Sequence, residues 1–229
     1  MNLLSGEIQQ RYHRPVLLVV EDTDKTEKER AENIFFKHAQ TLAGFNASVI
    51  YTFPIELRHS REFGDIKRYF HTHRMPNIVL KKRDGSKNSD GWKVMVKALA
   101  RRMDWGLITH GARNSVIESS GGIMRYLIEL VSEAAYRALS RQCTCIEEQD
   151  TIRAIAELRK DFTAALRSDD YPLLAKRHAD KWLNSDDQMQ DLLRMRALLE
   201  YENGDVWCDV RPVILPLVEE HAYAPAAQS

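Results

Sequence analysis

The chain has 229 residues, 44% of them hydrophobic, and its 33 lysines and arginines balance 33 aspartates and glutamates. This length suits one large or two to three small domains, and zero net charge means that any nucleic-acid or membrane contact must be local. Three cysteines are too few for a secreted disulfide framework, and no apolar run reaches the ~20 residues that span a bilayer, so we expect a cytoplasmic protein without a membrane partner.

Apolar runs alternate with helical patterns in the first third of the chain. Residues 16–20 (VLLVV) predict a strand buried on both faces, and Glu21, Asp22 and Asp24 follow it directly. Further along we predict a helix over 27–45, a strand over 47–53, a helix over 60–74 and a strand over 75–82. Strands that alternate with helices are typical of a parallel α/β sheet.

Helices and one hairpin are predicted for the rest of the chain. Amphipathic patterns predict helices over 91–104, 121–142 and 150–166. Asp150 or Thr151 is the expected cap of the last helix. The stretch 168–196 predicts two short helices, and Asn203-Gly204 between two β-type runs predicts a hairpin with a type I′ turn. Short helices closed by a hairpin are typical of a winged-helix unit.

Three segments, in this order, resemble motifs of AAA+ ATPases. The run LLVVEDTDK (17–25) looks like the Walker B strand with its acids, and SVIYTFP (48–54) resembles the strand that ends in the sensor 1 residue. The run SSGGIMRYLIELVSEAA (119–135) is similar to the start of the lid helix, where an arginine serves as sensor 2. The final hairpin fits the winged-helix domain of the initiator clade and of STAND-type relatives, so the resemblance covers roughly residues 14–215.

The resemblance implies an α/β fold in three parts. We expect a partial parallel P-loop NTPase-like sheet, then a helical lid, then a small winged-helix-like domain. The AAA+-like core would span 1–108, the lid 109–168 and the winged-helix-like domain 169–229.

The acids and the threonine take catalytic roles in this family. By resemblance, Glu21 lies on the metal side and holds Mg²⁺ through water, while Asp22 acts on the attacking water. The family's usual order is Asp then Glu, so the exchange puts efficient hydrolysis in doubt. Thr52 is the sensor 1 candidate, since a hydroxyl at the carboxyl end of a strand lies where α/β ligands bind; an ordinary strand residue is the alternative.

Glycines and arginines supply the other candidates. Gly121 and Gly122 permit a close turn that aims Arg125, the sensor 2 candidate, at a phosphate; a surface ion pair is its alternative. Arg74 is the arginine-finger candidate for a neighbouring subunit's nucleotide, with Arg68 second, and a cation at a helix C-terminus is the alternative for both.

A P-loop, G-x-x-x-x-G-K-[ST], does not occur in the 229 residues, although ATPases need it to hold the β- and γ-phosphates. The first strand begins so early that we expect no P-loop strand and helix before it. One hypothesis is therefore a portion of an AAA+ ATPase that binds and hydrolyses ATP with Mg²⁺ only when another segment or subunit supplies the P-loop.

The alternative hypothesis is a non-catalytic AAA+-like protein-interaction module. In either case we expect the isolated chain to have no ATPase activity. We also expect the protein to assemble as a homo- or hetero-oligomer. DNA binding by the tail is a third possibility. A protein partner is favoured over DNA because residues 200–210 carry acids and no lysine or arginine.

Overall fold

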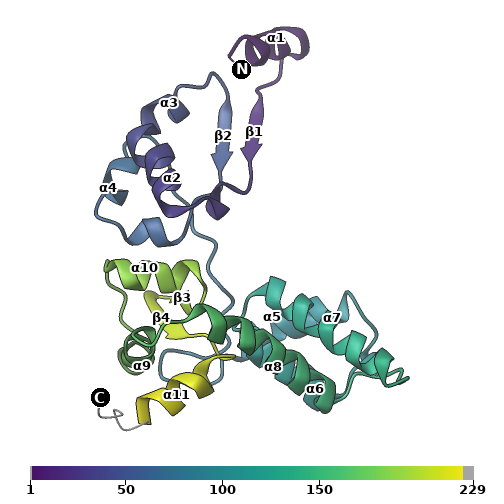
Figure 1. Cartoon of the computed structure of the whole chain (residues 1–229). Coiled ribbons are helices and arrows are strands. Elements are labelled where there is room, and N and C mark those ends of the chain that lie inside the picture. Colours follow the sequence, from purple (N-terminus) through teal and green to yellow (C-terminus); the bar gives the residue numbers. More distant parts are fainter. Residues whose placement is uncertain (1, 224–229) are drawn as a thin grey trace. The chain divides into compact units, whose positions relative to one another are not determined.

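The computed structural model describes residues 2–223, and the chain divides into two compact units (Figure 1). Unit 1 holds the described residues up to Arg74 together with Asn184–Arg194, and unit 2 holds Met75–Leu183 with the described residues from Met195 onward. The fold is mixed α/β with a short parallel sheet, as expected. The division at 108 and 168 stays a prediction, since compact units need not follow evolutionary domains.

Unit 1 is built around two parallel strands. β1 (Leu17–Val20) pairs with β2 (Ser48–Tyr51) so that Val20 lies opposite Tyr51. The helical segments are α1 (Asn2–Tyr12), η1 (Thr23–Lys25), α2 (Lys28–Glu32), the π-helix η2 (Asn33–Lys37), α3 (Ala39–Ala43), η3 (Glu56–His59), α4 (Phe63–Ile66) and α10 (Asp187–Arg194). An aromatic core fills the space behind β2, where Phe35 contacts Tyr51 and Phe53 edge to face.

One face of this sheet is open, contrary to the prediction of a first strand buried on both faces. Leu17, Val19 and Ile50 are 58%, 55% and 54% exposed. Helices α2 and α3 lie on one side of the strands (Figure 1), so they cover only the opposite face. Parallel strands in complete domains are covered on both faces.

Two further predictions for residues 60–82 are wrong. The predicted helix over 60–74 is α-helical only in α4. Phe70 still packs against Tyr51 in the core, but residues 71–73 are exposed and no apolar side chain there continues a buried helical face. The predicted strand over 75–82 does not join the parallel sheet. It belongs to unit 2, where the Ile78 N–H donates to Gly122 O at 3.2 Å and the side-chain Nδ2 of Asn77 donates to Glu200 O at 2.9 Å.

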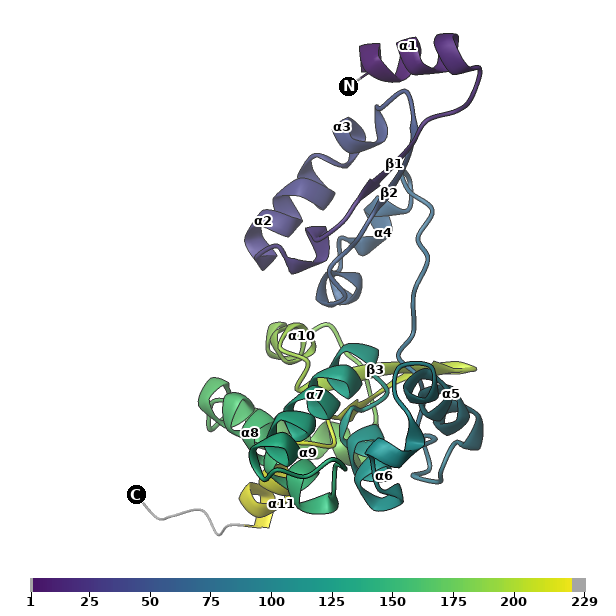
Figure 2. The same cartoon turned by 90° about the vertical axis from the view of Figure 1, so that its right-hand side faces the viewer.

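Unit 2 is mainly helical. Its helical segments are α5 (Ser89–Ala100), η4 (Trp105–Leu107), α6 (His110–Ser119), α7 (Met124–Ser140), α8 (Glu148–Ala165), α9 (Asp170–Asp180) and α11 (Leu215–Tyr223). The three predicted amphipathic helices are confirmed as α5, α7 and α8, and α6, α7 and α8 lie side by side in Figures 1 and 2. The predicted cap of α8 is wrong: Glu147 is the N-cap, and Asp150 completes a capping box with it.

The predicted hairpin is present as β3 (Leu198–Asn203) and β4 (Asp205–Val210). Its turn is not type I′, because Glu202 lies opposite Val206 and, of the two turn residues, Gly204 alone has positive φ, +83°. Whether α9, α10 and this hairpin form a winged helix stays a prediction. No helix among residues 2–223 combines the length and the apolar character needed to cross a bilayer.

Candidate functional site

The carboxyl edge of β1 and β2 brings the predicted catalytic residues of unit 1 together. Because Val20 lies opposite Tyr51, Glu21 and Thr52 leave the sheet side by side, and Thr52 N–H donates to Val20 O at 3.1 Å. In parallel α/β sheets, ligands bind at this edge. Strand pairing thus places Thr52 beside Glu21 at this edge, and the catalytic roles of these residues stay a prediction.

Two threonine hydroxyl groups, those of Thr23 and Thr52, lie together at this edge, and Thr23 was not predicted from the sequence. Thr23 Oγ1 lies 3.0 Å from Thr52 Oγ1 and also donates to the Thr52 carbonyl. The Asp24 N–H donates to Thr52 Oγ1 at 3.2 Å. Thr52 is thus held in place by the acidic loop itself. The position of Thr23 between Asp22 and Asp24 is the signal that could have identified it.

The two leading acids remain accessible to solvent. Glu21 and Asp22 are exposed, and Asp22 has a left-handed backbone with φ +65°. Asp22 Oδ1 pairs with Lys25 Nζ at 2.5 Å, with both side chains half exposed or more. A pair this accessible contributes about 1 kcal/mol at most, so a ligand could displace Lys25 at small cost.

The donor set at this edge fits one half of a Mg²⁺–ATP site. Carboxylate and hydroxyl oxygens are the ligands Mg²⁺ takes, usually with several waters and substrate phosphates. Among the described residues no group of three His, Cys, Asp or Glu side chains is arranged to hold a metal alone. The metal would therefore need phosphate oxygens, and a Gly-rich cradle for those phosphates is missing from the sequence.

The Gly-Gly turn of unit 2 has a packing role. Gly121 and Gly122 are buried between α6 and α7 with φ +62° and +80°. A Cβ on Gly122 would lie 1.8 Å from Ile78 O, and a Cβ on Gly121 would lie 2.6 Å from Leu199 Cδ1. Close packing explains both glycines, and their role toward a cofactor stays a prediction.

Arg125 lies in the first turn of α7 and is exposed. Glu21 and Asp22, with which it would share a nucleotide, belong to the other unit. Its sensor 2 role therefore stays a prediction.

A buried arginine next to this turn was missed. Arg211 is fully buried, its Cζ lies 3.3 Å from the centroid of the Tyr126 ring, and it lies 4.7 Å from that of Phe162. Burial lowers the pKa of Arg211. Burial also raises the pKa of Tyr126, but the guanidinium groups of Arg211 and Arg196 outweigh it and leave that pKa below its usual value. The first turn of α7 is consequently electropositive, and the arginine directly after strand β4 was the available signal.

The arginine-finger candidates do not lie at the end of a helix as predicted. Arg74 is half-buried in an extended stretch, because α4 ends at Ile66. Arg68 is in a turn just after α4, where its guanidinium lies 3.6 Å from the Asp65 carboxylate. Arg74 is too far from α4 to act as its helix-terminal cation, whereas Arg68, in the turn that follows Ile66, keeps that alternative role.

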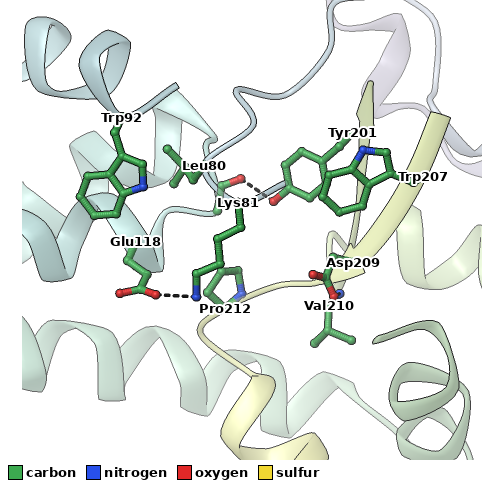
Figure 3. Close-up of a pocket in the computed structure, with 10 residues that line it drawn as sticks. Leu80, Lys81, Trp92, Glu118, Tyr201, Trp207, Asp209, Val210 and Pro212 are labelled. Atoms are coloured by element: carbon green, nitrogen blue, oxygen red, sulfur yellow. Dashed lines mark hydrogen bonds and ion pairs between the residues drawn. The ribbon is translucent and has the colours of Figure 1, made fainter. Parts of the chain in front are cut away.

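Unit 2 also contains a small pocket with aromatic walls (Figure 3). Trp92, Tyr201 and Trp207 line it, and Tyr201 Oη donates to Gly121 O at 2.7 Å. Lys81 and Glu118 pair across it at 2.6 Å. Its volume is about 40 Å³, whereas pockets for small ligands usually reach ~300 Å³ or more. It has room for waters and none for a nucleotide.

Comparisons with known proteins give little guidance. No protein-family model matches the sequence, and no curated protein matches it. Among solved structures, the crystal structure of Cdc6p from Pyrobaculum aerophilum is similar with 12% identity and a TM-score of 0.43, over 96% of this chain and 70% of that one. A likeness this distant identifies no family.

Proposed function

We propose that β1, β2 and the loops after them form the Walker B and sensor 1 half of an AAA+ ATPase site. The observation that supports this proposal is the convergence of Glu21, Asp22 and Thr52 at one carboxyl edge of a parallel strand pair. A P-loop from another segment or another subunit would complete the site for ATP and Mg²⁺. The assembly would then be a homo- or hetero-oligomer.

Each residue has a specific role in this proposal. Glu21 holds Mg²⁺ through water, and Asp22 releases Lys25 and orients the attacking water. Thr52, fixed by the Asp24 N–H and by Thr23, presents its hydroxyl to that water or to the γ-phosphate. Arg125 acts as sensor 2 from the electropositive first turn of α7, with Gly121 and Gly122 shaping the turn before it. Arg74 serves a neighbouring subunit's nucleotide.

The open sheet face supports a P-loop supplied from elsewhere. Two four-residue strands are marginal as an isolated sheet, and parallel sheets are stable when both faces are covered. A further strand would pair at the edge of this sheet, and its helix would cover the exposed Leu17, Val19 and Ile50.

The second candidate function is a non-catalytic interaction module of the same ancestry. The pairing of Asp22 with Lys25 favours it, because the carboxylate that would orient the attacking water already has a cation as its partner. A chain of this kind would bind protein partners through its open surfaces and would not turn over ATP.

We expect the chain as written to show no ATP turnover above a blank. The test repeats the ATPase assay on a chain that is extended at its N-terminus by the residues encoded upstream of Met1 in the same reading frame. If the extension supplies a P-loop, turnover should appear, and Asp22→Asn should lower kcat by about 100-fold or more, the contribution of a general base. Binding of a fluorescent ATP analogue with Mg²⁺ should be retained in that variant.

Asp65→Asn is the matched control, since it removes an exposed carboxylate of unit 1 away from the strand edge. Turnover by the chain as written, or equal activity of the extended wild type and Asp22→Asn, would contradict the proposal. An extended chain that binds no nucleotide would favour the interaction module.

A further inference from the structure

Positive charge is concentrated in one short segment of unit 2. Residues 81–102 contain eight lysines and arginines against two aspartates, within a chain whose formal net charge is zero. A local excess of this size creates a positive field that the composition of the whole chain conceals.

Helix α5 carries its positive charges and its buried apolar residues on opposite sides. Gly91, Met95 and Leu99 are buried, four residues apart, and form the face that packs into unit 2. Lys93, Lys97 and Arg101 follow the same spacing two positions later, which places them about 200° around the helix at ~100° per residue. The three cations therefore form one exposed stripe about 12 Å long, at 1.5 Å per residue.

A small hairpin before α5 adds to the stripe. Its arms pair through Lys82 N–H to Ser86 O at 2.7 Å and Asn88 N–H to Leu80 O at 2.9 Å. Lys87 Nζ lies 3.9 Å from the ring centroid of Trp92, in the first turn of α5. This contact fixes the basic hairpin against the N-terminal end of α5.

Most of these cations lack an acidic partner. Lys81 pairs with Glu118, and Lys93 pairs with Asp90 at 3.0 Å on the surface. Within residues 2–223 no carboxylate lies within ion-pair distance of the remaining six, which are exposed: Lys82, Arg83, Lys87, Lys97, Arg101 and Arg102. Asp84 interacts electrostatically with Lys82 alone among them. We define the α5 basic face as these six residues together with Lys93.

We propose that the α5 basic face binds the phosphate backbone of a nucleic-acid duplex without reading its sequence. A continuous stripe of lysines and arginines matches a phosphate array that carries one charge per ~1.7 Å of helix axis. This surface is distinct from the tail considered for DNA binding from the sequence, and it is independent of the nucleotide site at β1 and β2.

Single strands are a poorer match because proteins bind them through exposed aromatic platforms on which bases stack. Trp92, the aromatic residue beside the stripe, is covered by Lys87 at 3.9 Å and is only partly exposed. The α5 basic face thus offers point charges without a stacking surface.

The test is fluorescence anisotropy with a labelled mixed-sequence DNA duplex of about 30 base pairs, titrated with the full chain at several salt concentrations. Binding should weaken with salt, with a slope of log K against log salt between about −3 and −5. The double variant Lys97→Gln/Arg101→Gln should lower affinity at least tenfold at ~0.1 M salt and reduce the slope by about 2.

The matched control is Lys160→Gln/Lys176→Gln, which removes two exposed charges from α8 and α9 of the same unit. Its affinity should stay within about twofold of wild type, and both variants should melt as wild type does because all four side chains are exposed. An affinity without salt dependence, or equal losses in the two variants, would overturn the proposal. Tighter binding to single-stranded DNA or to phosphatidylserine vesicles than to the duplex would also overturn it.

Discussion

Replacing Gly122 by alanine should destabilise unit 2 by about 3 kcal/mol or more. The new Cβ would lie 1.8 Å from Ile78 O and 2.8 Å from Ile78 C, so the backbone of the 75–80 segment would have to move. That movement would break the Ile78 N–H bond to Gly122 O. It would also pull Val79 away from Leu199, Tyr201 and Trp207, with which it forms a buried cluster. The residue's φ of +80° adds a local backbone cost of about 1 kcal/mol.

The variant Gly204→Ala measures the free-energy cost of a positive φ at alanine without a steric clash. Gly204 has nearly the same φ, +83°, at the tip of the β3–β4 hairpin, and a Cβ added there would meet no atom within 4 Å. We expect this variant to lose only about 1 kcal/mol. Urea denaturation monitored by tryptophan fluorescence gives the free energy of unfolding of unit 2 in both variants, since all four tryptophans lie in that unit. Similar losses in the two variants would show that contact with Ile78 does not constrain Gly122.

The spacing of apolar residues predicted the helices and strands that pack against segments close to them in the sequence. The amphipathic stripes of α5, α7 and α8 are visible in the sequence because each helix buries residues spaced three and four apart. The β1–β2 pair followed from two apolar runs separated by a helical pattern, and their parallel direction placed Thr52 beside the acids. The open face of the sheet could not be predicted, because an apolar strand does not reveal which chain or segment covers it.

The segment 75–82 shows where such reasoning fails. Its run of Ile78, Val79 and Leu80 has the composition of a buried strand, and these residues do lie in a core. That core is formed by the hairpin some 120 residues later and by the Gly122 turn, so backbone pairing with β1 and β2 is lost. Strand propensity measures the fit to an apolar surface and does not identify that surface.

Residues with long-range polar roles were also missed. Arg211 meets Tyr126 and Phe162 from a distant part of the sequence, and no spacing rule connects them. The cap of α8 was misplaced by three residues. Asp150 suits an N-cap by residue type, but the reciprocal bonds of a capping box put Glu147 there instead.

Asp150→Ala should destabilise unit 2 by about 2 kcal/mol, the contribution of a hydrogen bond to a charged group. The loss stays moderate because Arg141 is 24% exposed and keeps Glu147 as a partner at 3.0 Å. Asp150 is fully buried in the first turn of α8. Its two oxygens accept from Arg141 Nε at 2.8 Å and Arg141 Nη2 at 2.7 Å, and Oδ2 also accepts from Glu147 N–H at 3.0 Å. One carboxylate thus joins the C-terminal end of α7 to the N-terminal end of α8. Asp161→Asn, an exposed change on the same helix, should be nearly neutral.

The contribution of Asp150 should depend on pH in a defined direction. The hydrogen bonds from Arg141 lower the pKa of Asp150 and outweigh burial, which raises it. A carboxyl group with a depressed folded-state pKa stabilises the fold fully above its unfolded value, ~3.9, and progressively less as the pH falls below it. The gap in unfolding free energy between wild type and Asp150→Asn should therefore be constant from about pH 6 to 7 and shrink below about pH 4. A gap that is unchanged down to about pH 3 would show that packing and neutral hydrogen bonds, and not the charge of Asp150, hold α7 and α8 together.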